Sequence, residues 1–156
     1  MLRLRGDFTV NVISLLIPKG QTAFLYEDYT IRQGLEKLRI HGYTAIPVLD
    51  RDGTYVGTVS EGDFLWSILD REDNSIKAQE KVMLRTILRP GFNPPVRIDV
   101  TLEELVDRAM RQSFIPVVDD RNAFIGIVTR QNIIRQLTVA EVQFTQFKPE
   151  PALVNA

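Results

Sequence analysis

The sequence contains no cysteine among its 156 residues and only one histidine. The absence of cysteine excludes a disulfide scaffold, a thiolate zinc site and a cysteine nucleophile. It also fits a reducing compartment. No second imidazole or thiolate can complete a metal-ligand set around His41. We therefore expect a cytoplasmic protein that has no metal site and requires no cofactor.

The chain also lacks an excess of charge and a long apolar segment. Its 19 Lys and Arg against 20 Asp and Glu leave a net charge of −1, which gives no global field to attract nucleic acid or a membrane surface. The apolar stretch VISLLIP (residues 12–18) is too short to span a bilayer. With 44% apolar and 25% charged residues, the composition is typical of a soluble globular protein.

The chain does contain an internal repeat. The stretch IPVLDRDGTYVGTVSEGDFL (residues 46–65) aligns without a gap on IPVVDDRNAFIGIVTRQNII (residues 115–134), at an offset of 69 residues. The matched pairs include Asp50 with Asp119, Gly57 with Gly126, Ser60 with Thr129 and Asp63 with Asn132. A single long period of this kind indicates two copies of one small unit rather than a solenoid.

Each copy predicts the same order of elements. Two β-branched, aromatic-rich runs form a hairpin, and Gly53 and Asn122 occupy the same turn position, which indicates a positive φ there. A helix follows each hairpin, and a helix that begins with a capping box, at Thr30 or Thr101, precedes it. A short strand comes before that helix. The predicted fold is α+β, with two β-α-β-β-α units.

The repeat divides the chain into four predicted parts. Residues 10–70 form the first unit, which includes a short N-terminal helix over residues 11–18, and residues 93–138 form the second unit. Residues 71–92 connect them, with a charged helix over 71–88 that RPGFNPP interrupts. Residues 139–156 are predicted to be a loose C-terminal tail, because the end of the chain is rich in proline and has no periodicity.

The repeated pattern of IPV, an apolar residue and Asp, then the turn and a G-apolar-apolar-S/T-x-x-D/N segment, resembles the cystathionine-β-synthase-type (CBS) domain. Two copies in tandem resemble a Bateman module, and the resemblance covers about residues 10–138. It implies that the two units pack sheet against sheet about a pseudo-two-fold axis. It also implies clefts between the units that bind adenosine nucleotides, and pairing of modules into dimers through their helices.

The first copy carries the stronger candidate site. The helix that begins after Ser60 offers unpaired N–H groups and a positive dipole end to a phosphate. Asp63 lies one turn into this helix, and the family pattern gives its carboxylate the task of holding two ribose hydroxyls. The base is expected along the preceding strand, beside Tyr43, Thr44, Ala45 and Pro47.

The second copy departs from the pattern. Its candidate residues are Ile115 and Pro116 on the strand, with Thr129, Arg130 and Asn132 at the helix start. Asn132 replaces the carboxylate by a neutral amide, which weakens the expected ribose contact by about 1 kcal/mol, or roughly fivefold in affinity. Arg130 suits a bidentate phosphate contact. Two unequal sites are therefore expected.

These observations favour a regulatory module that binds a nucleotide of the AMP, ADP and ATP class, forms a homodimer and signals to a partner protein. The alternatives are a ligand-free dimeric interaction scaffold, or a sensor of a cyclic adenine dinucleotide or S-adenosylmethionine. An enzyme is not expected, since the sequence shows no nucleophile–base pair and no paired carboxylates at mechanistic spacing. Asp63 discriminates between sensor and scaffold: a free carboxylate in an open cleft favours sensing, whereas a carboxylate used to cap its own helix in a filled cleft favours a scaffold.

Overall fold

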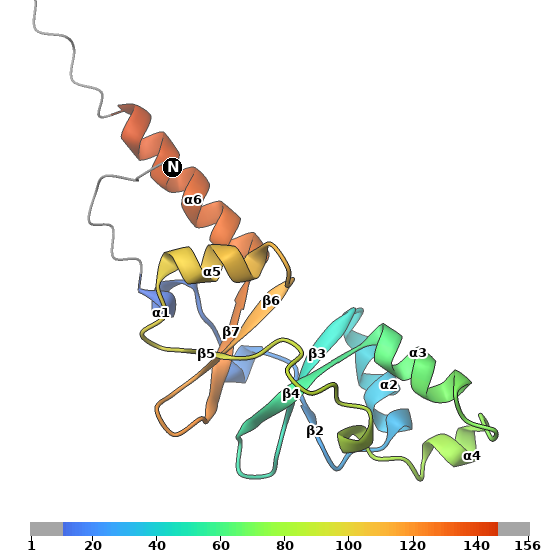
Figure 1. Ribbon diagram of the computed structural model, residues 1–156. Helices are drawn as coiled ribbons and strands as arrows, with labels where there is room; N and C mark the ends of the chain where they lie inside the picture. The colour runs from blue at the N-terminus through green and yellow to red at the C-terminus, as the bar shows by residue number, and fades with distance from the viewer. Residues whose placement is uncertain (1–10, 147–156) are drawn as a thin grey trace, which may run out of the picture.

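The computed structural model describes residues 11–146, with side chains described as far as residue 139. Two α+β units lie with their sheets between two outer groups of helices: α2 and α3 flank one sheet, and α5 and α6 flank the other (Figure 1). The first sheet has the strand order β2-β3-β4, and the second has the order β1-β7-β6-β5. The strands are β1 (Ile17–Pro18), β2 (Leu25–Tyr26), β3 (Ala45–Leu49), β4 (Tyr55–Ser60), β5 (Val96–Arg97), β6 (Phe114–Val118) and β7 (Phe124–Thr129). The helices are α1 (Val12–Leu15), α2 (Ile31–His41), α3 (Glu61–Leu69), α4 (Ile76–Gln79), α5 (Leu102–Ala109) and α6 (Arg130–Gln146).

The two hairpins have the same register, as the repeat predicts. In the first, Ala45 pairs with Ser60, and in the second, Phe114 pairs with Thr129. The positive φ predicted at the common turn position is confirmed, with 89° at Gly53 and 65° at Asn122. Each hairpin is preceded by a parallel strand, β2 or β5, and so both units have the predicted β-α-β-β-α order.

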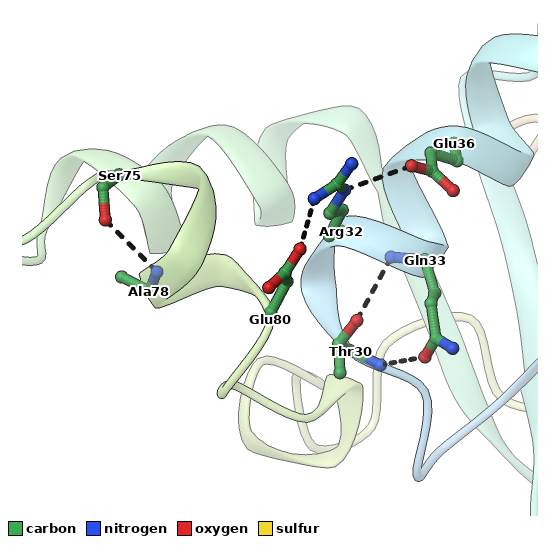
Figure 2. A network of polar contacts seen from close by, with 7 residues as sticks. All are labelled: Thr30, Arg32, Gln33, Glu36, Ser75, Ala78 and Glu80. Carbon is green, nitrogen blue, oxygen red and sulfur yellow. Dashed lines mark hydrogen bonds and ion pairs between the residues drawn. The ribbon is translucent and has the colours of Figure 1, made fainter.

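The first helix of the first unit begins with the predicted capping box. Thr30 Oγ1 accepts a hydrogen bond from the Gln33 N–H at 3.2 Å, and Gln33 Oε1 accepts one from the Thr30 N–H at 2.9 Å (Figure 2). Arg32 of α2 then pairs with Glu36 on its own helix and with Glu80 after α4. This helix start therefore also holds the segment that follows the first unit.

The matching helix of the second unit is capped differently from the prediction. Thr101 accepts a hydrogen bond from the Glu104 N–H at 3.2 Å. The Glu104 carboxylate instead accepts one from Arg108, one turn along the helix, at 3.2 Å. The second capping box is therefore only half formed, because an i,i+4 ion pair competes for the glutamate.

The two units meet through equivalent residues. Thr54 and Ala123, which differ by the repeat offset of 69, form an isolated bridge between the hairpin turns. A buried cluster lies beside this bridge and again contains repeat equivalents, the pairs Leu49 with Val118 and Tyr55 with Phe124. Contact between like positions is what a two-fold axis produces, and the predicted pseudo-two-fold packing is confirmed.

The segment that precedes each unit packs on the other unit. Strand β1 pairs with β7, and α1 buries Val12 and Leu15 in the core of the second unit. The connecting segment packs on the first unit, where Leu84 is fully buried and donates its N–H to Tyr29 O at 2.8 Å. A short N-terminal helix is present, but it covers Val12–Leu15 instead of residues 11–18, and Ile17–Pro18 form β1, whose pairing partner β7 lies in the second unit.

The predicted continuous helix over residues 71–88 is also wrong. This stretch contains only the four-residue helix α4 and a 3₁₀ turn over Leu84–Thr86. Asp73 accepts the Ser75 N–H at 2.9 Å in a local turn, and Ser75 starts α4 as a new helix. Beyond α4, the Val82 carbonyl accepts the Ile31 N–H at 2.8 Å. Tertiary pairing has therefore replaced helical hydrogen bonds.

The predicted start of the tail at residue 139 is wrong as well. Helix α6 continues to Gln146, and the first proline after it is Pro149. Nothing in residues 139–146 breaks a helix, so the compositional signal of the tail applies only further along the chain. The remainder of the predicted tail lies outside the described residues.

Candidate functional site

Two of the predicted base-binding residues of the first copy, Ala45 and Pro47, lie on the face of β3 that points away from the core of their own unit; Ala45 is half-buried there and Pro47 is buried. Along β3, Ile46 and Val48 point into the core of the first unit, so Ala45 and Pro47 point to the opposite face. Ala45 pairs with Ser60 and Pro47 with Thr58. The structure therefore brings the predicted strand residues next to the start of α3.

The two residues before β3 lie differently. The Thr44 carbonyl accepts the Glu61 N–H at 2.9 Å, which uses one of the free N–H groups expected at the start of α3. The Tyr43 ring, 44% exposed, stacks on His41 with 5.3 Å between ring centroids. Thr44 therefore lies at the predicted site through its backbone, whereas Tyr43 stacks on the end of α2.

Asp63 is engaged on both carboxylate oxygens. Its Oδ2 accepts hydrogen bonds at 2.8 Å from both the backbone N–H and the hydroxyl of Ser60. The Ser60 hydroxyl in turn accepts the Asp63 N–H at 3.3 Å, which completes a capping box. The other oxygen, Oδ1, lies 2.7 Å from Nε of Arg89. By the criterion set from the sequence, Asp63 is not a free carboxylate in this conformation.

Arg89 is the site residue that sequence reasoning missed. Its Nη2 also reaches Asp63 Oδ2, at 3.3 Å, and its guanidinium lies 3.6 Å from the centroid of the Phe92 ring. The Asp63 side chain is 9% exposed and that of Arg89 is 49% exposed, so Arg89 covers the carboxylate from the solvent side. Arg89 lies in the irregular connecting segment, where neither periodicity nor the repeat gives a signal for it.

A closed ring of hydrogen bonds fixes the connecting segment just after Arg89. The Tyr55 hydroxyl donates to the Asn93 carbonyl at 2.7 Å, and Asn93 Nδ2 donates to Thr58 Oγ1 at 3.1 Å. Because the Tyr55 proton is thus used, the 2.7 Å contact between the two hydroxyls must have Thr58 as its donor. Burial raises the pKa of Tyr55 to about 12, against the lowering effect of the Thr58 hydrogen bond.

The surface beside Asp63 is a shallow open depression of about 490 Å³ between α3 and the connecting segment. Arg71 and Arg89 contribute positive charge, and Trp66 contributes an aromatic ring that is 62% exposed. The remaining lining residues are Asp63, Ser67, Asp70, Thr86 and Ile87. Asp63 and Asp70 balance the charges of the two arginines, and the depression does not enclose a ligand.

The helix start in the second unit is used for structural contacts. Thr129 Oγ1 accepts the Asn132 N–H at 3.2 Å, and Asn132 Nδ2 donates to the Leu15 carbonyl at 3.3 Å. Asn132 thereby holds α1, the helix that leads into β1. Asp63 and Asn132 therefore play the same role in the two units: Asp63 contacts the connecting segment that packs on the first unit, and Asn132 contacts the N-terminal segment that packs on the second.

Two other predicted residues of the second copy have different surroundings from those expected. Arg130 Nε donates to the carbonyl of Ala109 at 2.6 Å and to that of Gln112 at 3.2 Å, so Arg130 caps the end of α5. Ile115 is 0% exposed in the core of the second unit. Pro116 lies on the opposite face of β6, and its neighbour on that face is Phe114, which the period-two alternation of the strand could have identified.

The described residues offer little for other chemistry. No group of three or more His, Cys, Asp or Glu side chains within them is placed to hold a metal ion. No helix in the same part of the chain has the length and apolar character needed to cross a membrane.

Comparisons with known proteins match this architecture. A family model for the CBS domain matches residues 17–70 and 82–139. Cyclic di-AMP receptor B of Bacillus subtilis strain 168 is 26% identical over 144 residues, which cover 88% of this chain and 94% of the receptor. Against larger relatives the chain covers less; it spans only 20% of the inosine-5′-monophosphate dehydrogenase of Methanocaldococcus jannaschii, at 26% identity over 70% of this chain.

Solved structures agree with the sequence comparisons. A crystal structure of CBSX2 in complex with AMP has a TM-score of 0.69 and 25% identity, and covers 84% of this chain and 98% of CBSX2. A structure of CbpB in complex with c-di-AMP has a TM-score of 0.79 at 22% identity, covers 88% and 91% of the two chains, and establishes likeness of fold. The chain belongs to the CBS domain family, as a tandem pair of CBS domains, or Bateman module.

Proposed function

We propose that this CBS domain pair is a regulatory module that binds a ligand containing adenosine 5′-phosphate at the start of α3 and signals to a partner protein. The observation that supports it is the nearly end-to-end match with two small relatives: CBSX2, whose structure was solved in complex with AMP, and the Bacillus subtilis receptor, which is named for cyclic di-AMP. Adenosine 5′-phosphate is the unit that these two ligands share.

The first site is the stronger of the two. Asp63 retains the charged carboxylate that can accept ribose hydroxyls, whereas Asn132 donates its amide to Leu15 and cannot supply two acceptor oxygens. Ala45, which is half-buried, pairs with Ser60 on the strand, whereas Pro47 is buried, so a base at this strand would contact Ala45 first. We expect one ligand per chain to bind at Asp63 with higher affinity than at the second site.

The ligand test is thermal unfolding of protein shown to be nucleotide-free, with AMP, ADP, ATP, cyclic di-AMP, S-adenosylmethionine and GMP as separate additions. A ligand at about 100 times its Kd adds roughly 2.7 kcal/mol to the free energy of unfolding, which raises the Tm of a chain of this size by about 5–10 °C. The Asp63→Ala variant should lose most of the shift. Asp28→Ala, which also removes a carboxylate paired with an arginine, is the matched control. No shift with any adenosine compound would refute the proposal.

A ligand-free scaffold is the second candidate, because Asp63 is used by its own helix cap and by Arg89. Both candidates share a proposed homodimer. The exposed repeat equivalents Leu65 on α3 and Ile134 on α6, with 51% and 56% of their surfaces exposed, support pairing through these helices. Light scattering of Leu65→Lys and Ile134→Lys tests the dimer separately from ligand binding.

A further inference from the structure

We infer that Arg89 is an internal competitor for the ligand at Asp63, and that exchange of Arg89 for the ligand releases residues 89–92 of the segment that joins the two CBS domains. This inference rests on the proposed function and adds its regulation. It starts from the ion pair itself, in which Nε of Arg89 lies 2.7 Å from Asp63 Oδ1 and Nη2 lies 3.3 Å from Oδ2.

The acceptor capacity of the carboxylate makes the two partners exclusive. Oδ2 already accepts two hydrogen bonds from Ser60, and Arg89 adds a third. An oxygen of this kind has about two acceptor positions, so Ser60 alone fills Oδ2, while Oδ1 has one position left with Arg89 bound and two after Arg89 leaves. Two neighbouring ribose hydroxyls therefore cannot bind the carboxylate until the guanidinium leaves.

The Asp63 carboxylate keeps hydrogen-bond donors in both states, so the exchange of Arg89 for ribose hydroxyls does not leave a buried charge without partners. The Asp63 side chain is only 9% exposed, and a carboxylate with so little contact with water needs donors. Two ribose hydroxyls can replace the donors that Arg89 withdraws. The Arg89 side chain is 49% exposed, so its guanidinium can return to water on leaving.

Arg89 is carried by a short turn between two fixed points. The Phe92 N–H donates to the Arg89 carbonyl at 3.3 Å, and the Phe92 ring stacks on the guanidinium. Before this turn, Leu88 packs against Gly57, and after it Asn93 is fixed to Tyr55 and Thr58. We call residues 89–92 the linker turn. Its ion pair with Asp63 is the contact that ties it to the start of α3.

The linker turn leads directly into the second unit. Two prolines follow Asn93 before β5 begins at Val96, and the Pro94 carbonyl accepts a hydrogen bond from Arg108 of α5 at 3.0 Å. Loss of the Arg89 contact therefore frees residues 89–92 from α3, next to the point where Asn93 is held by the first unit and Pro94 by the second. This links occupancy of one site to the connection between the two CBS domains.

Arg89→Ala and Arg89→Gln test the inference, with Arg51→Ala as the control. Arg51 forms a comparable ion pair with Asp28 at 2.9 Å, so Arg51→Ala removes the same charge at a different place on the surface. The probe for calorimetry is adenosine, which has the ribose hydroxyls but no phosphate that Arg89 could bind. We expect both Arg89 variants to bind adenosine about two- to fivefold more tightly than the wild type, the range that loss of a partly exposed ion pair allows. Arg51→Ala should bind as the wild type does.

Hydrogen–deuterium exchange of peptides that cover residues 86–92 tests the release without any ligand. We expect Arg89→Ala to raise their deuterium uptake, Arg51→Ala to leave it unchanged, and adenosine to raise uptake in the wild type toward the level of Arg89→Ala. Equal or weaker adenosine binding by Arg89→Ala would overturn the competition, and weaker binding would make Arg89 a ligand contact instead. Unchanged uptake in Arg89→Ala would overturn the release. A wild type that binds no adenosine compound refutes the proposed function, while the exchange comparison still decides whether Arg89 holds the linker turn.

Discussion

Replacing Gly126 by alanine should disconnect the N-terminal segment from the second unit. Gly126 has a φ of 153°, and a Cβ placed there would lie 2.2 Å from the carbonyl oxygen of Ile17. That oxygen belongs to the backbone of β1, which pairs with β7 at this position, so no side-chain rotation relieves the clash. The strand β1 must move away, and α1 must move with it.

The cost follows from what that movement exposes. Val12 and Leu15 are 1% and 5% exposed in the core of the second unit, and exposing each costs about 1.5–3 kcal/mol. Burial measured against an extended unfolded chain is an upper estimate, and a partial displacement of the segment retains some of the contacts, so the net loss is smaller than the sum for the two side chains. We expect Gly126→Ala to lower the free energy of unfolding by about 2–4 kcal/mol, the range of severe single substitutions.

Gly57→Ala is the matched control, because Gly57 is the repeat equivalent of Gly126. A Cβ at Gly57 would lie 3.2 Å from Cδ2 of Leu88, the end of a flexible side chain that can shift. We expect this variant to lose less than about 1 kcal/mol. Urea unfolding followed by circular dichroism measures both variants. Equal destabilisation of the two, or a loss below about 0.5 kcal/mol in Gly126→Ala, would contradict the assigned close approach of β1.

Three further predictions concern the packing around the site. Because the pKa of Tyr55 is raised to about 12, the free energy of unfolding should fall between about pH 10 and pH 12, where the unfolded chain ionises this phenol and the folded chain does not. The expected loss is about 2–3 kcal/mol. Urea unfolding at each pH measures it, and Tyr55→Phe should remove this pH-dependent component. Thr30→Ala should cost about 1 kcal/mol in urea unfolding because it removes half of a capping box on an 11-residue helix, whereas Ser75→Ala, at the start of the exposed four-residue helix α4, should cost less. Gly34→Ala should destabilise the fold by about 1–3 kcal/mol, since its Cβ would lie 2.8 Å from the buried Phe64 ring; a gain in Tm, as expected from helix propensity alone, would contradict this packing.

The repeat in the sequence determined much of the fold. Matched apolar alternation, matched turn residues and matched capping residues specify both hairpins and the helices beside them, because these signals depend on neighbours a few residues apart. Gly53 and Asn122 have the positive φ that the alignment indicated. The same local signals located Ser60 and Asp63 at the start of a helix, and the strand face beside them.

Only the tertiary structure decided how the connecting segments are used. The sequence alone suggested a helix over residues 71–88, but part of this stretch pairs with residues before α2, and Leu84 fills the core of the first unit. Nothing local in the sequence indicates that β1 crosses to β7, since that pairing joins positions more than 100 residues apart. The partners of Asp63 and Asn132, which are Arg89 and the Leu15 carbonyl, come from those same segments. The sequence by itself therefore determined which residues stand at the site, and the long-range docking of two connecting segments decided what those residues contact, because such contacts depend on the path of the chain in space rather than on its local pattern.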